Sequence, residues 1–366
     1  MAEQIDPWSG EAPEDYSQLS EKFGIEPFEE VLDKLPDPSH QMRRNLIFGH
    51  RDFEKIAERI NKGQDYAVMT GLMPSGKMHL GHKMVVDQLK WYQNHGASLY
   101  LCVADLESHI TRDFSLEEAR EIAFEEYLKN YQALGLDLEK CHVYFQSESE
   151  SVKRLAYTLG KKVNFSELRA IYGYEGDTSA SRIFYPMIDV SDILRPQLEE
   201  YEGPIPTVVP VGIDQDPHLR LSRDVANRFE SEFGFVPPSS TYGRLIQGLD
   251  GEKMSSSNPD NAIFLTDPVD EVKSKIDDAV TGGRHTIEEQ REKGGKPEEC
   301  MIYNFYVYHL IPDDEELLEV KEACESGEMT CGECKGKAFD LLKNFLEEHK
   351  EKREEIGEID ESILSN

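Results

Sequence analysis

The chain has 366 residues, which is enough for two domains of ordinary size. Its hydrophobic fraction of 38% fits a globular protein and excludes an intrinsically disordered one. No apolar run approaches the roughly 18 residues that cross a bilayer, and the acidic residues 1–30 carry no signal-peptide pattern. We therefore expect a cytoplasmic protein with no membrane partner.

The charge balance is strongly acidic, with 72 acidic residues, 40 basic residues and a formal net charge of −32. Taken alone, this argues against binding a polyanion, but net charge does not describe a local patch. The plain interpretation is a solvated acidic surface. An alternative is adaptation to a salty cytoplasm, where screening makes self-repulsion tolerable. Stability that does not rise between low and molar KCl would end that alternative.

Residues 1–65 are acidic and contain prolines, and we interpret them as an N-terminal extension with a helix near residues 51–61. From residue 66 the pattern changes to α/β, because short apolar runs alternate with helical stretches. Ser115 and Glu118 have the spacing of a capping box that begins one of these helices. Strands are predicted at residues 66–70, 99–103, 142–145 and 206–211.

This alternation predicts a Rossmann-like α/β fold, in which helices cover a parallel sheet. Residues 149–200 indicate a helical insertion in that domain. Beyond Pro268, at the first position of a helix, the pattern is helical almost to the end. We thus expect an extension at residues 1–65, a catalytic domain at 66–267, and an all-helical C-terminal domain at 268–366.

The first chemical signal is the segment at residues 74–82, between the first strand and its helix. In an open α/β sheet, ligands bind at the carboxyl ends of strands, where helix N-termini face phosphates. Gly76 and Gly81 would let a nucleotide approach the backbone closely. His79 and His82 supply ring N–H donors to phosphate oxygens that gain charge during a reaction.

The second signal is the sequence Lys-Met-Ser-Ser-Ser at residues 253–257, in a small polar loop. A lysine followed by serines is by itself typical of an ordinary surface loop. The pairing is more informative: an early His-x-Gly-His and a late Lys-Met-Ser-Ser-Ser, in this order, resemble the class I aminoacyl-tRNA synthetases. In that family both segments converge on ATP, and the lysine loop closes over the pyrophosphate.

The resemblance implies adenylation of an amino acid by ATP with Mg²⁺, followed by acyl transfer to tRNA. Such chemistry needs positioning and charge neutralisation rather than a protein nucleophile. We expect neither a tightly bound cofactor nor a metal held by protein side chains. The implied catalytic residues are His79, His82, Lys253, Ser255 and Ser256. The implied ATP-binding residues are Pro74, Ser75, Gly76, Gly81, His82, Asp214, Lys253, Met254 and Ser257.

Three features distinguish between the tyrosyl and tryptophanyl families. Residues 212–226 and residues 281–289 resemble tryptophanyl segments of the archaeal and eukaryotic type. Archaeal tyrosyl enzymes place a tyrosine at the end of the first strand, where this chain has Met69, which better suits an apolar ring. The resemblance, over roughly residues 40–350, is therefore to the tryptophanyl family.

The indole N–H requires an acceptor, and a carboxylate in an apolar pocket is a strong one. Asp192 matches the aspartate that has this role in bacterial relatives. Asp189 stands where related sequences often have glutamine, and two carboxylates one helical turn apart should repel or share a proton. Either could instead be a helix cap or an ion-pair residue. Glu107 and Gln215 are weaker candidates for binding the amino and carboxylate groups of the substrate.

The resemblance also implies the tryptophan tRNA as partner, a homodimer, and a C-terminal domain that reads the anticodon. Any tRNA site must gather basic residues locally, although exposed helix charges are common without one. The alternatives are a tyrosine–tRNA ligase, an inactive synthetase-like RNA- or protein-binding module, and a cofactor adenylyltransferase. The basic candidates are Arg284, Arg291, Lys293, Lys335, Lys337 and Arg353.

Six cysteines occur, and in a chain without a signal peptide reduced thiols are expected. Cys331 and Cys334 form a Cys-x-x-Cys pair, a zinc-ligand spacing, with Cys324 nearby. Because no second such pair or histidine pair lies close in the sequence, we interpret them as ordinary structural cysteines.

Overall fold

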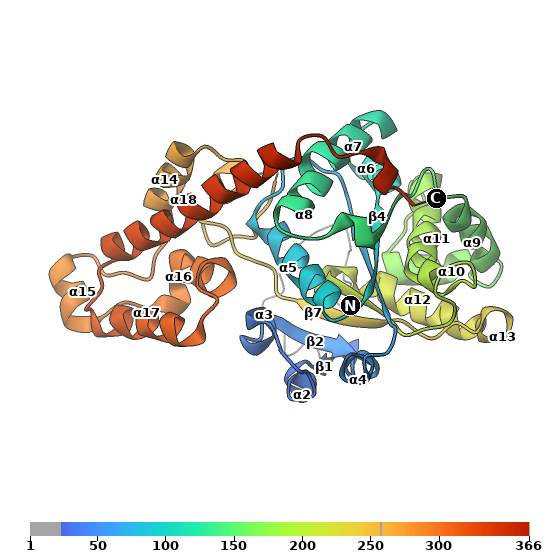
Figure 1. Cartoon of the computed structure of the whole chain (residues 1–366), viewed down its shortest axis with the longest axis horizontal. Helices are drawn as coiled ribbons and strands as arrows, with labels where there is room; N and C mark the ends of the chain where they lie inside the picture. Colours follow the sequence, from blue (N-terminus) through green and yellow to red (C-terminus); the bar gives the residue numbers. More distant parts are fainter. Residues whose placement is uncertain (1–22, 257, 366) are drawn as a thin grey trace. The chain divides into compact units, whose positions relative to one another are not determined.

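A seven-stranded sheet forms the centre of the larger part of the chain (Figure 1). The computed structural model describes residues 23–256 and 258–365. The strand order is β1-β2-β7-β6-β3-β4-β5. The strands are β1 (Glu26–Pro27), β2 (Ile47–Arg51), β3 (Ala67–Leu72), β4 (Ser98–Val103), β5 (Cys141–Phe145), β6 (Thr207–Gly212) and β7 (Ser239–Gly243).

The five strands β3 to β7 are parallel, which confirms the predicted Rossmann-like sheet. Val68, Leu99 and Val143 are fully buried, as expected of parallel strands covered on both faces. The predicted N-terminal extension instead contributes β1 and β2, which pair antiparallel at the sheet edge. The sheet is therefore mixed, and residues 23–65 are part of the domain.

Helices connect the parallel strands, and their ends follow from local sequence. The capping box at Ser115 is formed, with the hydroxyl accepting from the Glu118 N–H at 3.2 Å and the Glu118 carboxylate accepting from the Ser115 N–H at 2.8 Å. This part contains α2 (Glu29–Leu32), α3 (His40–Arg43), α4 (Glu54–Lys62), α5 (Leu80–Asn94), α6 (Asp105–Arg112), α7 (Leu116–Ile122), η1 (Ala123–Leu128), α8 (Lys129–Ala133) and η2 (Leu138–Lys140).

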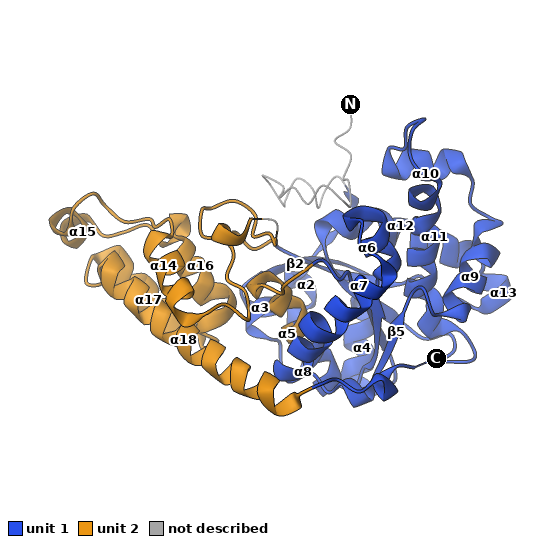
Figure 2. Ribbon diagram, turned by 90° about the horizontal axis from the view of Figure 1, so that it is seen from above, with its two compact units in different colours: residues 1–75, 88–244, 358–366 blue, residues 76–87, 245–357 orange. Residues whose placement is uncertain are grey.

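The predicted helical insertion lies between β5 and β6. Figures 1 and 2 both show its helices α9 to α11 grouped with α12, and these elements bury a common apolar core. The elements are α9 (Glu150–Gly160), α10 (Phe165–Tyr172), α11 (Ala180–Leu194) and η3 (Arg195–Gln197), then η4 (Ile213–Gln215), α12 (Asp216–Arg228) and α13 (Glu230–Phe233).

The chain divides into two compact units, coloured in Figure 2. The first comprises residues 1–75, 88–244 and 358–366, and the second comprises residues 76–87 and 245–357. Beyond its first segment, the second unit is helical, as predicted for the C-terminal region. Its later elements are η5 (Pro259–Asn261), α14 (Val269–Asp278), α15 (Ile287–Lys293), η6 (Pro297–Glu299), α16 (Met301–Phe305), η7 (Tyr306–Leu310), α17 (Asp314–Ser326) and α18 (Cys331–Ile356); η8 (Glu361–Ile363) belongs to the first unit.

Candidate functional site

Residues 76–82 of the histidine motif and the lysine loop lie far apart along the chain, but they belong to the same unit and contact each other. His79 forms an isolated antiparallel bridge with Phe264, and the Leu80 N–H donates to the Ile263 carbonyl at 3.0 Å. The Ser256 hydroxyl donates to the carbonyl of Lys77 at 3.4 Å. The histidine motif is therefore held against the lysine loop and the segment that follows it.

The two histidines of the motif have a defined protonation pattern. Their ring centroids are 4.0 Å apart. The His79 N–H donates to His82 Nδ1 at 3.1 Å, and the Gly81 N–H donates to His79 Nδ1 at 3.1 Å. Because a backbone N–H can only donate, both Nδ1 atoms are acceptors, and each neutral ring carries its proton on Nε2. The motif therefore presents two Nε2–H donors.

The environment keeps both rings neutral. Burial lowers the pKa of His79 to about 2, and the nearby His82 and Lys253 act in the same direction. Burial likewise lowers the pKa of His82 to about 4, although a hydrogen bond with the backbone of His79 acts in the opposite direction. Neutral imidazoles at pH 7 can donate hydrogen bonds to phosphate oxygens without forming an ion pair in the ground state.

The glycine between the histidines is needed for space. A Cβ atom on Gly81 would lie 2.8 Å from His79 Cε1 and 2.9 Å from His79 Nδ1. Any side chain at this position would therefore displace the His79 ring. Gly76 has a φ of +125°, a conformation that favours glycine.

The backbone of the lysine loop is fixed by several hydrogen bonds. The backbone of Lys253 forms an isolated antiparallel β-bridge with that of Gln247, and the Met254 N–H donates to the Ile246 carbonyl at 3.1 Å. The Asn261 side chain donates to the Lys253 carbonyl at 3.1 Å and accepts from the Ser255 N–H at 3.4 Å. Met254 is buried and anchors the loop. The predicted ATP ligand Ser257 lies outside the described residues.

Three of the predicted ATP-binding residues belong to the first unit. Pro74 and Ser75 follow β3, where the Ser75 N–H donates to the Tyr127 hydroxyl at 3.3 Å and Ser108 donates to the Pro74 carbonyl. Asp214 lies in η4, directly after β6. Both positions are at the carboxyl edge of the parallel sheet, where open α/β folds bind their ligands.

The predicted indole acceptor Asp192 is fully buried inside α11, whose N-cap is Ser179, so it is not a helix cap. Its Oδ1 accepts from the Tyr144 hydroxyl at 2.9 Å, and its Oδ2 accepts from Gln146 Nε2 at 2.6 Å. Burial raises the pKa of Asp192 to about 7; the Gln146 hydrogen bond opposes that shift, whereas the charge of Asp189 adds to it. The Asp192 carboxyl group therefore changes between its protonated and its charged form near pH 7.

Asp189, one turn earlier, pairs with a histidine that the sequence argument did not single out. Its Oδ2 lies 3.0 Å from His218 Nδ1, which is also 3.1 Å from the Tyr172 hydroxyl. Burial by itself would lower the pKa of His218, but Asp189 and Glu107 raise it above its usual value. The expected repulsion between the two carboxylates contributes, after burial, to the raised pKa of Asp192, whereas Asp189 is ion-paired with His218.

Sequence reasoning missed the polar residues that surround Asp192. Gln146 follows β5 directly, and its Nε2 also donates to the Tyr185 hydroxyl at 3.3 Å. Its Oε1 is buried and has no hydrogen-bond partner among the described residues. The sequence could have indicated Gln146 through its position directly after a buried strand. Glu107 and Gln215 lie at the same edge of the sheet, and both are half-buried. Met69 is buried in the core cluster that includes Tyr185.

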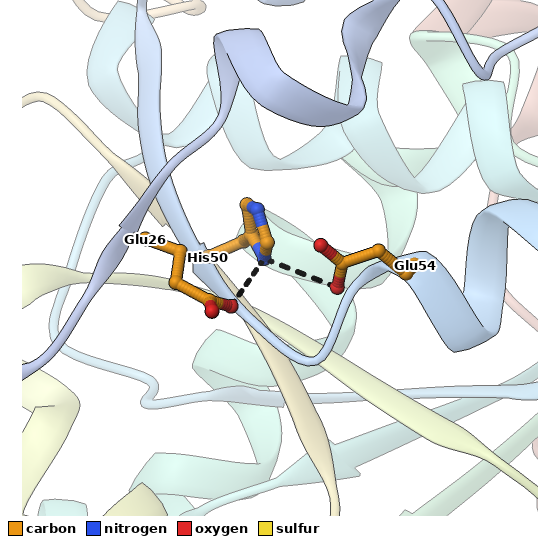
Figure 3. Close-up of side chains that lie close together, drawn as sticks. All are labelled: Glu26, His50 and Glu54. Atoms are coloured by element: carbon orange, nitrogen blue, oxygen red, sulfur yellow. Dashed lines mark ion pairs between the residues drawn. The ribbon is translucent and has the colours of Figure 1, made fainter.

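A second group of ionisable side chains lies in the first unit, shown in Figure 3. The fully buried His50 places Nδ1 3.7 Å from Glu26 and 3.9 Å from Glu54. The same Nδ1 accepts from the Phe53 N–H at 3.4 Å, and burial lowers the pKa of His50 despite the two glutamates. Glu26 is exposed and Glu54 is half-buried, and we interpret the group as polar contacts that join β1, β2 and α4.

Most of the basic residues proposed for tRNA already have partners within the second unit. Arg284 Nε donates to the Gly294 carbonyl at 2.8 Å, and Lys335 Nζ donates to the carbonyls of Asp277 and Ala279. Lys293 pairs with Glu289 at 2.9 Å and Lys337 with Glu316 at 3.0 Å. Arg291 is exposed, and Arg353 is half-buried in α18. These contacts indicate structural roles for Arg284 and Lys335.

Within the part of the chain that the structure describes, no helix combines the length and apolarity needed to span a bilayer.

Comparisons with known proteins identify the family. The family described as tRNA synthetases class I (W and Y) matches residues 61–347. The tryptophan–tRNA ligase of Methanocaldococcus jannaschii is 52% identical, covering 99% of this chain and 98% of its own, and that of Methanosarcina acetivorans is 44% identical, covering 97% of both. The crystal structure of the tryptophanyl-tRNA synthetase from Aeropyrum pernix has a TM-score of 0.89 at 46% identity, covering 96% of each chain. The chain therefore belongs to the class I tryptophanyl-tRNA synthetases.

Proposed function

We propose that the protein activates tryptophan with ATP and then transfers it to the 3′ end of the tryptophan tRNA. In the first step a tryptophan carboxylate oxygen bonds to the α-phosphorus of ATP, while the bond from that phosphorus to the bridging oxygen breaks. Pyrophosphate leaves and tryptophanyl-adenylate remains. In the second step a hydroxyl of the terminal ribose takes the acyl group and AMP leaves.

The observation that carries this proposal is the pair of neutral histidines held against the lysine loop. The Nε2–H groups of His79 and His82 can donate to phosphate oxygens as charge develops on them, and Lys253 can neutralise the departing pyrophosphate. After burial and the neighbouring His82, the charge of Lys253 also lowers the pKa of His79, which supports a shared role for the three groups. Mg²⁺ arrives with ATP and neutralises further phosphate charge, and Ser255 and Ser256 supply hydroxyl donors.

Tryptophan selection is assigned to the buried carboxylate of the first unit. Asp192 accepts the indole N–H, a group that can only donate, and Met69 offers an apolar side chain without a partner for a phenolic hydroxyl. Asp189 is the second tryptophan-binding residue, and its pairing with His218 keeps the local charge balanced. Glu107 is assigned to the substrate ammonium and Gln215 to its carboxylate.

Family membership further supports a helical anticodon-reading region at residues 268–366, a homodimer and a cytoplasmic enzyme. The test of the function is aminoacylation of two transcribed tRNAs, one with the tryptophan anticodon and one with the tyrosine anticodon, each with both amino acids. The expected result is charging only of the tryptophan tRNA with tryptophan. Charging of the tyrosine tRNA with tyrosine would overturn the substrate assignment, and no charging by a folded enzyme would favour a binding module.

A further inference from the structure

A buried arginine belongs to the network around the Asp192 carboxylate. Arg195 is the first residue of η3, and it lies three residues after Asp192 in the sequence. Its exposed fraction is 0%. Among the described residues, no carboxylate forms an ion pair with its guanidinium. Burying a charge without an ion-pair partner costs free energy, so other groups have to compensate for this cation.

Two tyrosine rings and two hydroxyls hold the guanidinium. Its central carbon lies 3.7 Å from the centroid of the Tyr144 ring and 4.4 Å from that of Tyr201. Its Nε donates to the Ser151 hydroxyl at 3.2 Å, and its Nη2 donates to the Tyr201 hydroxyl at 2.8 Å. Its Nη1 is buried and has no hydrogen-bond partner among the described residues. Because its hydrogen bonds are incomplete, contact with the faces of aromatic rings is a main source of compensation.

Tyr144 connects this cation to the carboxylate of the tryptophan site. Its ring lies against Arg195, and its hydroxyl donates to Asp192 Oδ1 at 2.9 Å. A cation over the ring draws electron density from it, which makes the phenolic O–H a stronger hydrogen-bond donor. Burial and the charge of Asp192 raise the pKa of Tyr144 well above its usual value, whereas Arg195 opposes that shift. A buried positive charge and a buried negative charge therefore act on the same tyrosine.

We propose that Arg195 is a positioning residue of the tryptophan site, which acts through Tyr144 to favour the charged, indole-accepting form of Asp192. The inference rests on the proposed tryptophan activation and adds to it a residue outside the proposed set of substrate ligands. Its physical reason is that each of the two buried charges lowers the cost of burying the other across the tyrosine. The stacked guanidinium also fixes the ring, so that the Tyr144 hydroxyl stays directed at Oδ1.

Other ionisable groups lie close to this network. Asp189 of α11 raises the pKa of Asp192, after burial, and is itself ion-paired with His218 of α12. Burial and the charge of Asp192 raise the pKa of Cys102 in β4 well above its usual value. Burial by itself would lower the pKa of His218, but Asp189 and Glu107 raise it, so a test must separate the titration of His218 from that of Asp192. The remaining groups are Tyr100, Asp105, His142, Tyr185, Tyr201 and Glu202.

The test is the pH dependence of tryptophan affinity, measured by calorimetric titration of the full-length protein from about pH 5.5 to 9.5. Arg195→Met removes the charge at a similar side-chain volume, so Asp192 should become charged at a higher pH. We expect the midpoint of the rise in affinity to move up by about one pH unit. Tryptophan should then bind about fivefold more weakly at about pH 7 and less than about twofold more weakly at about pH 9, as the charged fraction of Asp192 requires.

A role in charge also differs from a role in packing in its kinetics and in its control. With saturating tryptophan, the kcat of Arg195→Met should stay within about twofold of the wild type, because a positioning residue does not touch the reacting atoms. The matched control is Arg120→Met. Arg120 places its guanidinium carbon 4.6 Å from the ring centroid of Phe145, the residue after Tyr144 in β5. This control should leave the midpoint unmoved.

Two variants test the route from Arg195 to Asp192. Tyr144→Phe keeps the cation and removes the bridging hydroxyl, so it should also move the midpoint up. Adding Arg195→Met to Tyr144→Phe should weaken tryptophan binding by less than about a further twofold, because the two changes break the same connection. In Asp192→Asn, the Arg195→Met change should have no effect on the pH dependence, which separates Asp192 from His218.

An upward shift in Arg195→Met and Tyr144→Phe, absent in Arg120→Met, would support the proposal. An unmoved midpoint in folded Arg195→Met, or an equal shift in Arg120→Met, would overturn it. If Arg195→Met does not fold, Tyr144→Phe gives the answer, and an unmoved midpoint in that variant would overturn the proposal. Wild-type protein that neither binds tryptophan nor exchanges pyrophosphate with it would instead refute the proposed function, whatever the variants show.

Discussion

Replacing Asp192 with asparagine is the sharpest perturbation of the tryptophan site. Asparagine has the same shape and can keep both internal contacts, because its oxygen can accept from Gln146 while its NH₂ donates to the Tyr144 hydroxyl. What disappears is the negative charge that we propose accepts the indole N–H. A hydrogen bond to a charged partner contributes about 1.5–3 kcal/mol, so the KM for tryptophan should rise about 10- to 150-fold.

The effect should depend on pH in a definite direction. The pKa of Asp192 is about 7, so its acceptor strength in the wild-type protein grows as pH rises through neutrality. Tryptophan affinity should therefore rise between about pH 5.5 and 8.5 in the wild type and stay flat in Asp192→Asn. The KM for ATP should stay within about twofold, because this carboxylate is not among the proposed ATP-binding residues.

The assay is ATP–pyrophosphate exchange at several pH values, with calorimetric titration of tryptophan as an independent measure of affinity. A matched control is Asp105→Asn, which alters another buried carboxylate of the same unit, one that accepts from the Ser147 N–H at 3.1 Å. The control should leave the tryptophan KM within about twofold. A tryptophan KM in Asp192→Asn that changes less than twofold at every pH would refute the assignment of Asp192.

The remaining predictions concern stability and the phosphate site. The folded pKa of Asp192 lies above its usual 3.8, so its contribution to stability is lost as pH rises from about 4 to 7, by roughly 4 kcal/mol; melting curves of Asp192→Asn should lack this loss, and parallel curves for both proteins would contradict it. Gly81→Ala should lower kcat by about 100-fold with tryptophan affinity intact, because the new Cβ displaces the His79 ring; single-turnover adenylate formation measures this, and a normal rate would remove the steric argument. Lys253→Ala should bind tryptophan normally yet form adenylate about 100- to 1,000-fold more slowly, and unchanged turnover would remove the lysine from the mechanism. The folded pKa of His82 lies below its usual value, so the wild type should lose stability as pH falls from about 6.5 towards 4, whereas His82→Gln should lose less on thermal melting; equal losses would show that His82 does not titrate as described.

The parallel part of the fold was predictable because its strands are short apolar runs bounded by glycine and proline. The strand β2 was not predictable, since its short sequence includes the polar residues His50 and Arg51. Its place depends on antiparallel pairing with β7, far along the chain, and Arg51 Nε also donates to the Tyr242 hydroxyl at 3.0 Å. Pairing over such a distance leaves no local pattern.

The candidate site likewise contains residues that local sequence predicts and residues that it does not. His79, His82 and Lys253 were predicted because each belongs to a motif of fixed spacing. The network of Tyr144, Gln146 and His218 was missed, because contacts between a strand end and two helices are not visible in local spacing.

The most direct test of the account is ATP–pyrophosphate exchange with each of the twenty amino acids, in Mg²⁺, at low and high KCl. We predict exchange with tryptophan alone. In the proposed mechanism the buried Asp192 carboxylate accepts the indole N–H, and the neutral histidine pair and Lys253 stabilise the charge on the phosphates. Exchange with tyrosine, or none with any amino acid from folded protein at both salt concentrations, would contradict the account.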